Sequence, residues 1–161
     1  MKKTKLLLLL PALAVIALDQ ISKFLITSTI PKYGSVPVIE GFFNLVHVRN
    51  RGMAFGLMNR PGHGLPFYFL VAATISAIAL LLFWFRKMKD KDFKITIGIG
   101  LILGGAVGNF IDRIRLGEVI DFLDFYAGPY HWPAFNVADT AITVGILWLA
   151  VYTIIRKPSK G

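Results

Sequence analysis

The chain contains no cysteine and few charged residues for its length. Without cysteine it can form no disulfide, thiolate zinc site or cysteine-ligated iron-sulfur cluster, and it has no cysteine nucleophile. Only 17% of its 161 residues are charged, whereas about a quarter are charged in an average soluble domain. A further 55% are hydrophobic, and the mean hydropathy is +0.63. This composition argues against a soluble monomer.

Several catalytic motifs are also missing. There is no His-Glu-x-x-His, and the three histidines, His47, His63 and His131, lie at unrelated spacings, which argues against a metal centre. No Gly-x-Ser-x-Gly elbow and no phosphate-cradling glycine motif occurs. If the chain is an enzyme, its carboxylates are the remaining reagents.

Apolar runs dominate what is present. Three uncharged stretches approach or meet the roughly 17 to 25 residues that a membrane-spanning helix needs, and a fourth, near the amino terminus, is interrupted by Asp19 and Lys23. The basic start at residues 2–5 also fits a cleavable signal peptide, but the apolar character continues beyond the polar interruption. We therefore expect an all-α integral membrane protein, a single polytopic domain without amino-terminal cleavage, with helices at about 6–26, 65–85, 95–113 and 139–155.

Basic residues predict the orientation of these helices. Eleven of the eighteen lysines and arginines lie in residues 2–5, in the 86–94 loop and in the carboxy-terminal tail. Because short cytoplasmic loops collect basic residues, both termini are expected inside. The net charge of +9 then reflects topology and contact with anionic lipid, and not nucleic-acid binding.

Two segments are expected outside the membrane on the opposite side. The first, about 27–64, contains the run Phe42–Arg49, whose β-branched and aromatic residues predict a strand in a small extracytoplasmic β-element. The second, about 114–138, is predicted as an outer loop. On helix three, Gly100, Gly104 and Gly108 recur every four residues and predict close contact with a neighbouring helix.

Acidic residues gather toward this outer side. Asp19 and Lys23 lie four apart on one helix face, a spacing that permits either a structural ion pair or a functional role. Asp121 and Asp139 have apolar neighbours and no local base; buried together, two such carboxylates would share one proton at neutral pH. Spacing alone leaves Asp124 as a rival to Asp121, and an N-cap role as the alternative for Asp139.

Asp112 and Arg113 end helix three, where they either hold the turn or support a site. A small transporter could also use intramembrane Asp and Lys, but it would need polar residues continuing to the inner face. A purely structural scaffold would explain the glycines but not the acids gathered on one side.

Five blocks in order resemble the lipoprotein signal peptidase (signal peptidase II) family, and together they span nearly the whole chain. They are Leu18–Lys23, Asn50–Gly56, Gly104–Arg113, Val119–Phe122 and Phe135–Asp139. The resemblance implies an aspartic endopeptidase of the bacterial inner membrane that cuts diacylglyceryl-modified prolipoproteins before the lipid-modified cysteine. It further implies an active site near the periplasmic face, no cofactor, no metal, and inhibitors of the globomycin type.

Carried over by motif, the catalytic pair is Asp121 and Asp139, and Asp124 becomes a neighbour. Other positions of the blocks are expected to bind substrate or to support the pair, namely Asp19, Lys23, Asn50, Gly52, Asn109, Asp112, Arg113 and Asn136. The aromatic residues of the outer segments, Phe42, Phe43, Phe55, Trp132 and Phe135, are expected to lie at the membrane interface.

Overall fold

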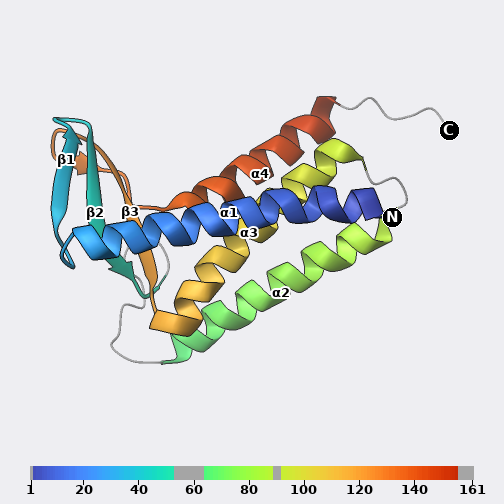
Figure 1. Ribbon diagram of the computed structural model, residues 1–161, viewed down its shortest axis with the longest axis horizontal. Coiled ribbons are helices and arrows are strands. Elements are labelled where there is room, and N and C mark those ends of the chain that lie inside the picture. Colours follow the sequence, from blue (N-terminus) through green and yellow to red (C-terminus); the bar gives the residue numbers. More distant parts are fainter. Residues whose placement is uncertain (1, 53–63, 89–91, 156–161) are drawn as a thin grey trace.

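Four long helices lie side by side along the length of the molecule and carry a small β-sheet at one end (Figure 1). The structure is a computed structural model that describes residues 2–52, 64–88 and 92–155. The helices are α1 (Lys2–Thr29), α2 (Leu65–Lys87), α3 (Phe93–Leu116) and α4 (Val137–Ile155). The strands are β1 (Ser35–Ile39), β2 (Phe43–Asn50), β3 (Val119–Ala127) and β4 (Tyr130–His131).

Each helix is long and apolar enough to cross a membrane. At 1.5 Å per residue, the 23 residues of α2 span about 34 Å, slightly more than the hydrocarbon core of a bilayer. Many large apolar side chains point outward from the bundle, as lipid-facing residues do. The predicted fold class, four transmembrane helices with a small β-element, is confirmed.

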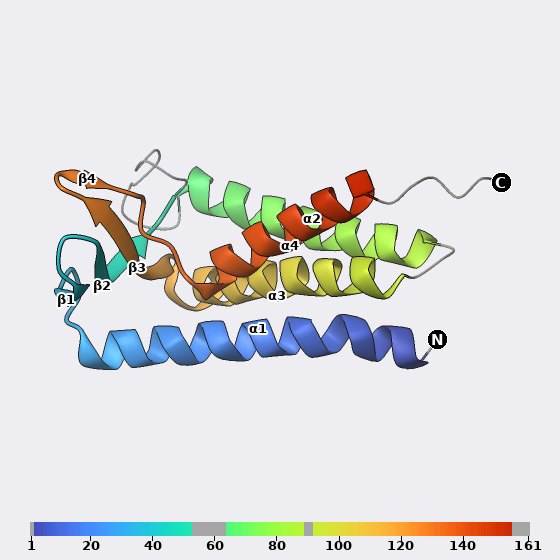
Figure 2. The same ribbon diagram turned by 90° about the horizontal axis from the view of Figure 1, so that it is seen from above.

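Helix α3 is the centre of the bundle. Helix α1 packs on one side of it and α4 on the other, and α2 also contacts α3 (Figure 2). A methyl group at Gly104 would stand 2.7 Å from the Ala12 carbonyl oxygen of α1, and one at Gly105 would collide with the Ala138 carbonyl of α4. The predicted close helix contact is therefore present, and it occurs on two faces of α3.

The sheet is antiparallel, with strand order β1-β2-β3-β4. The sequence predicted β2 within one residue but placed 114–138 in a loop, where the structure has β3, the longest strand. Asp121 and Asp124 interrupt the apolar run of β3, so the segment does not show the pattern of a strand in the sequence. Burial of Phe122 against Ile26 and Ile30 at the end of α1 holds the strand in place.

β2 and β3 join the sheet to the helices. In their register, Val48 pairs with Asp121 and Asn50 with Val119. Because paired residues share a face of the sheet, Asn50 and Asp121 project on the same side. This register brings the first half of the Asn50–Gly56 block to the strand that carries Asp121, while residues 53–56, including the expected interfacial Phe55, lie outside the described residues.

Candidate active site

Polar side chains converge where the ends of α1 and α3 nearest the sheet meet the start of α4 and the β2–β3 ladder. One buried network of charged and amide side chains begins on α1. Lys23 Nζ lies 2.8 Å from Asp19 Oδ2 and 2.8 Å from Asp112 Oδ2, and it donates to Asn109 Oδ1 at 3.0 Å. Asp19 and Lys23 are almost completely buried, at 0% and 1% exposure. The spacing of four residues thus makes an ion pair, and burial against α3 extends it to a second carboxylate.

Backbone amides anchor this network to the neighbouring elements. Asp19 Oδ1 accepts the backbone N–H of Ala138 at 3.0 Å, at the start of α4. Asp112 Oδ2 accepts the N–H of Ile120 at 3.2 Å, at the start of β3. Asp112 therefore holds the turn that follows α3 and fixes the strand on which Asp121 lies, while its support of a site stays a prediction.

Asn109 and Asn136 connect the network to Asp121 and Asp139. The Nδ2 of Asn109 donates to Asp139 Oδ1 at 2.7 Å, while its Oδ1 accepts from Asn136 Nδ2 at 3.2 Å. The same Asn136 Nδ2 lies 2.7 Å from Asp121 Oδ1. Asn136 is fully buried, and it contacts both aspartates.

The first turn of α4 explains the position of Asp139. Asn136 Oδ1 accepts the backbone N–H of Asp139 at 2.9 Å, and Asp139 Oδ2 accepts the N–H of Asn136 at 3.3 Å. This reciprocal pair is a capping box, in which Asn136 is the cap and Asp139 the residue three further on. The alternative of an N-cap role for Asp139 is therefore wrong in detail, because Asn136 fills that position.

Asp121 is the more enclosed of the two carboxylates. It is 2% exposed and accepts Asn136 Nδ2 on one oxygen and Asn50 Nδ2, at 3.0 Å, on the other. Burial raises the pKa of Asp121 to about 7, and the charge of Asp139 adds to the rise, while the two amide hydrogen bonds oppose it. Asp121 can therefore hold a proton near neutral pH, while half-buried Asp139 remains open to water.

The other predicted positions surround this pair. Asn50 Oδ1 accepts the backbone N–H of Gly52 at 3.1 Å, so the turn after β2 orients the amide that reaches Asp121. Arg113 is half-buried, and the charges of Asp139, Asp121 and Asp112 act on its guanidinium. Within the described part of the chain, no side-chain hydrogen bond ties Arg113 to any of them.

Asp124 belongs to a different cluster. Asp124 lies three positions after Asp121 along β3, and this odd offset places the two side chains on opposite faces of the strand. Its carboxylate accepts from Asn44 Nδ2 at 3.0 Å and lies 2.9 Å from Nδ1 of His131. The structure thus separates Asp124 from Asp139.

Sequence reasoning missed Gln20. Its Nε2 lies 3.2 Å from Asp19 Oδ2, 3.0 Å from Asp112 Oδ1 and 3.3 Å from the Gly108 carbonyl oxygen, so it closes the network between α1 and α3. An amide inside an apolar helical run is the signal that could have identified it.

Comparison with known proteins places this geometry in a family. Residues 11–155 match the family model described as Signal peptidase (SPase) II. The chain is 48% identical over 163 residues to the lipoprotein signal peptidase of Syntrophus aciditrophicus (strain SB), covering 100% of both chains. It is 52% identical to that of Oleidesulfovibrio alaskensis (strain ATCC BAA-1058 / DSM 17464 / G20), covering 88% of this chain and 91% of the relative.

A solved structure is also similar. A bacterial membrane enzyme determined by the in meso method at 1.9 Å resolution superposes with a TM-score of 0.81 at 30% identity. The match covers 98% of this chain and 96% of the solved one. The likeness therefore includes both the helical bundle and the sheet.

Proposed function

This chain belongs to the signal peptidase II family, and from that premise we propose that Asp121 and Asp139 are its catalytic pair. The protein is a multi-pass membrane protein of bacteria and a lipoprotein signal peptidase, which removes the signal peptides of lipid-modified prolipoproteins. The finer substrate assignment is that it cuts diacylglyceryl-modified precursors before the lipid-modified cysteine. Globomycin-type inhibitors would bind at the same pair.

One observation carries the catalytic assignment: buried Asn136 contacts both aspartates, through its side chain to Asp121 and through its backbone N–H to Asp139. A residue that holds two acidic side chains toward one point keeps them together despite their like charge. Sharing a proton relieves that repulsion and supplies one acid and one base. The rival Asp124 lacks this connection, because it lies on the other face of β3.

The mechanism follows from the unequal surroundings of the two groups. Asp139, ionised and open to water, takes a proton from the water whose oxygen attacks the scissile carbonyl carbon. Asp121 gives its proton to the carbonyl oxygen, which yields a neutral gem-diol. As the C–N bond breaks, Asp139 returns its proton to the departing amine and Asp121 takes one from a gem-diol hydroxyl. The products are a carboxylic acid and an amine, and both aspartates regain their starting states.

The supporting residues have positioning roles in this proposal. Asn50 and Asn136 hold Asp121, while Asn109 holds Asp139 and links it to Lys23. Arg113 stabilises negative charge as it develops, because it lies in the field of both aspartates. Asp19, Asp112 and Gly52 fix the backbone around them.

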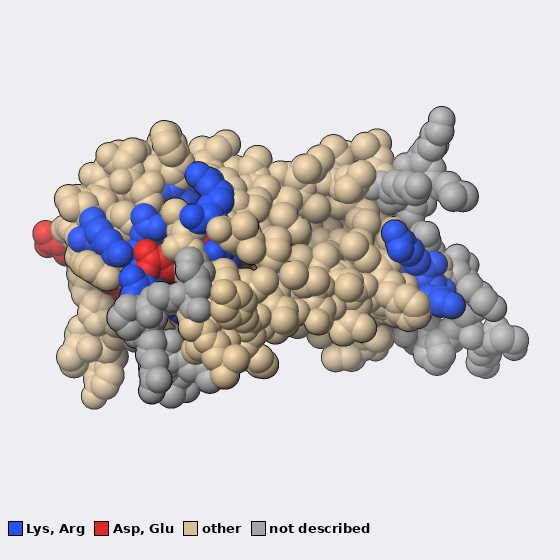
Figure 3. All heavy atoms as spheres, turned by 90° about the horizontal axis from the view of Figure 1, so that it is seen from below, with Lys and Arg blue, Asp and Glu red and all other residues tan. Residues whose placement is uncertain are grey.

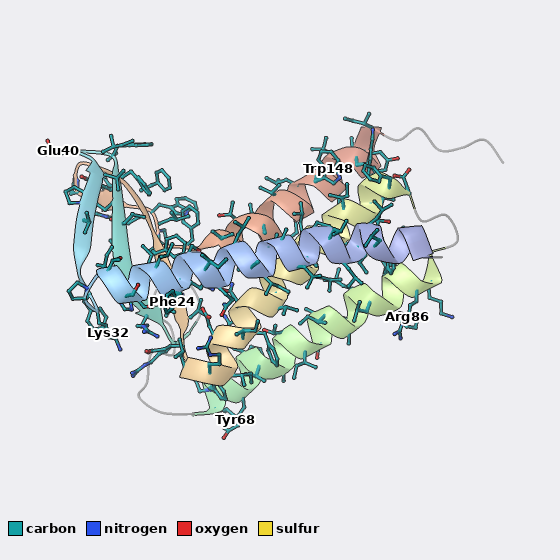
Figure 4. All side chains as sticks on the ribbon, viewed as in Figure 1. Phe24, Lys32, Glu40, Tyr68, Arg86 and Trp148 are labelled. Atoms are coloured by element: carbon teal, nitrogen blue, oxygen red, sulfur yellow. The ribbon has the colours of Figure 1, made fainter. Side chains whose placement is uncertain are left out.

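We further propose that the site lies near the periplasmic face of the inner membrane and that both termini are cytoplasmic. The last turn of α2 contains two basic residues, Arg86 and Lys87, and Arg86 lies at the end of the bundle opposite the sheet (Figure 4). Cytoplasmic loops collect such residues. The lipid chains of a precursor can then stay in the bilayer while its peptide bond reaches the site.

Cleavage of a diacylated lipobox peptide by detergent-solubilised protein tests the assignment. We expect Asp121→Asn and Asp139→Asn each to abolish release of the signal peptide, because either change removes one of the two proton routes. Asp124→Asn is the matched control in the same strand and should retain most activity. An inactive Asp124→Asn with an active Asp121→Asn would reject the pair, and activity in the Asp121/Asp139 double variant would reject the aspartic mechanism.

A further inference from the structure

A second charged cluster lies at the outer end of α1, outside the catalytic network. It consists of Lys32, Arg49, Arg51 and Glu118, and we call it the Glu118 cluster. Glu118 Oε1 lies 3.4 Å from Lys32 Nζ and 3.9 Å from Arg49 Nη1, and Glu118 Oε2 accepts from Arg51 Nε at 2.9 Å. Three cations around one carboxylate leave a formal charge of +2.

This cluster lies on a different face of the sheet from the active site. Arg49 pairs with Ile120, the residue before Asp121, so its side chain projects opposite to that of Asp121. Arg49 Nε donates to His47 Nε2 at 3.0 Å, and His47 Nδ1 lies 2.8 Å from the carbonyl oxygen of Ile30. The cluster is thus attached to the end of α1.

Some hydrogen-bond donors of the Glu118 cluster are not engaged by Glu118. Arg51 engages Glu118 through Nε, and its two Nη atoms have no hydrogen-bond partner within residues 2–52, 64–88 and 92–155. The side chains of Lys32 and Arg51 are 42% and 37% exposed. Burial alone would raise the pKa of Glu118, but its hydrogen bonds and charge contacts with Arg51 and Lys32 lower it below the ordinary value. Glu118 therefore stays ionised and orients these cations without neutralising them.

The cluster also lies just beyond the end of the apolar span of α1. The span in α1 ends at Thr29, three residues before Lys32, whose Nζ stands 5.3 Å from the ring centroid of exposed Tyr33. One turn earlier, Phe24 and Leu25 expose 69% and 54% of their surface. Basic side chains gather around an acidic one at the sheet end of the molecule (Figure 3). A molecule bound here would meet cations at its head and an apolar helix surface below.

We propose that the Glu118 cluster binds the phosphate headgroup of an anionic phospholipid in the leaflet that faces the sheet, with the acyl chains along the outer half of α1. Phosphate accepts hydrogen bonds from Arg Nη and Lys Nζ, and the surplus positive charge provides the attraction. The exposed apolar surface of α1 favours a lipid over an acidic peptide. This lipid is separate from the substrate and lies on another face of the sheet.

Photocrosslinking in liposomes tests the proposal. The protein is reconstituted in phosphatidylcholine with a small fraction of phosphatidylglycerol that carries an acyl-chain diazirine, and the labelled residues are mapped by mass spectrometry. We expect labelling of α1 near Phe24 and Leu25, which falls about fivefold for each charge removed, so roughly 25-fold in Lys32→Gln/Arg51→Gln. Labelling near Arg86 and Lys87, at the other end of the same molecules, is the internal control and should not change.

Further measurements distinguish an anionic phospholipid from free phosphate and from an acidic peptide. Glu118→Gln raises the formal charge and should increase labelling of α1; if that variant fails to fold, the double variant alone decides. A photoactivatable phosphatidylcholine should show no loss in the double variant, and free inorganic phosphate should not compete. Equal labelling of wild type and double variant would overturn the proposal, as would competition by free phosphate. Unchanged labelling with a raised KM for substrates that carry acidic residues would assign the cluster to the peptide instead.

Discussion

Replacing Asp121 with asparagine should change the pH dependence of stability as well as abolish activity. Burial raises the pKa of Asp121 from 3.8 to about 7 in the folded protein. A group whose pKa is raised on folding contributes stability that is complete below its unfolded pKa and is lost as the pH rises through the folded pKa. The wild-type protein therefore loses stability between about pH 4 and pH 7, and Asp121→Asn does not.

The size of this effect follows from the shift. About three pH units at 1.36 kcal/mol each give roughly 4 kcal/mol, an upper value because Asp121 and Asp139 titrate as a coupled pair. The amide also has a fixed cost of about 1–3 kcal/mol, since it cannot accept the hydrogen bonds of both Asn50 and Asn136. Only the change with pH is thus diagnostic, and it corresponds to a Tm difference growing by up to ~10 °C between about pH 4 and pH 8.

Thermal unfolding in detergent at both pH values measures this difference directly. Asp139→Asn tests the second cause of the shift, because removing the Asp139 charge should lower the pKa of Asp121 and flatten the wild-type pH dependence. A difference between wild type and Asp121→Asn that stays constant from about pH 4 to pH 8 would refute the assigned environment of Asp121.

Three further predictions concern other parts of the chain. Asn50→Ala should lower turnover of lipobox peptide about tenfold, equivalent to one hydrogen bond of about 1.4 kcal/mol, with little loss of Tm; equal losses of activity and folded yield would point to an ordinary turn. Lys23→Met leaves two buried carboxylates uncompensated and should destabilise the protein by about 3–5 kcal/mol in thermal unfolding, so an unchanged Tm would contradict the network. Because the chain has no cysteine, the single variants Ser35→Cys and Lys87→Cys each introduce one thiol whose side of the membrane can be measured. An impermeant thiol reagent applied to intact cells should label position 35 and not position 87. Labelling at position 87 alone would contradict the proposed orientation.

Local patterns in the sequence predicted the helices and β2 because these features depend on neighbouring residues. Long apolar runs predict membrane spans directly, and the helix bounds differ from prediction by a few residues at the ends. β3 was missed because its stability comes from pairing with β2, some 70 residues away, and from packing on α1. β1 contains Pro37, which cannot donate to a ladder and is tolerated because β1 is an edge strand.

Residue types alone left Asp121 and Asp124 equivalent, since both have apolar neighbours in one strand. The family motif favoured Asp121. The structure adds a physical reason, because side chains alternate between the two faces of β3 and only Asp121 lies on the face toward Asn136. Since the sequence did not predict β3, this reason could not be found from the sequence. The bridging position of Asn136 was also invisible, because it depends on the first turn of α4 meeting β3 in space. Sequence reasoning could name these residues as a group but not their contacts.

The same close packing that stabilises the bundle also positions Asp139, one of the two aspartates proposed to be catalytic. A methyl group at Gly108 would stand 2.7 Å from Asp19 Oδ2, and Asp19 Oδ1 holds the N–H of Ala138, the residue before Asp139. Any widening between α1 and α3 therefore acts on the first turn of α4, and through it on Asp139. Asn50 lies outside this chain of contacts, because it reaches Asp121 from β2. Changes along the α1–α3 interface should therefore alter stability and activity together, whereas a change at Asn50 can alter activity without loosening the bundle.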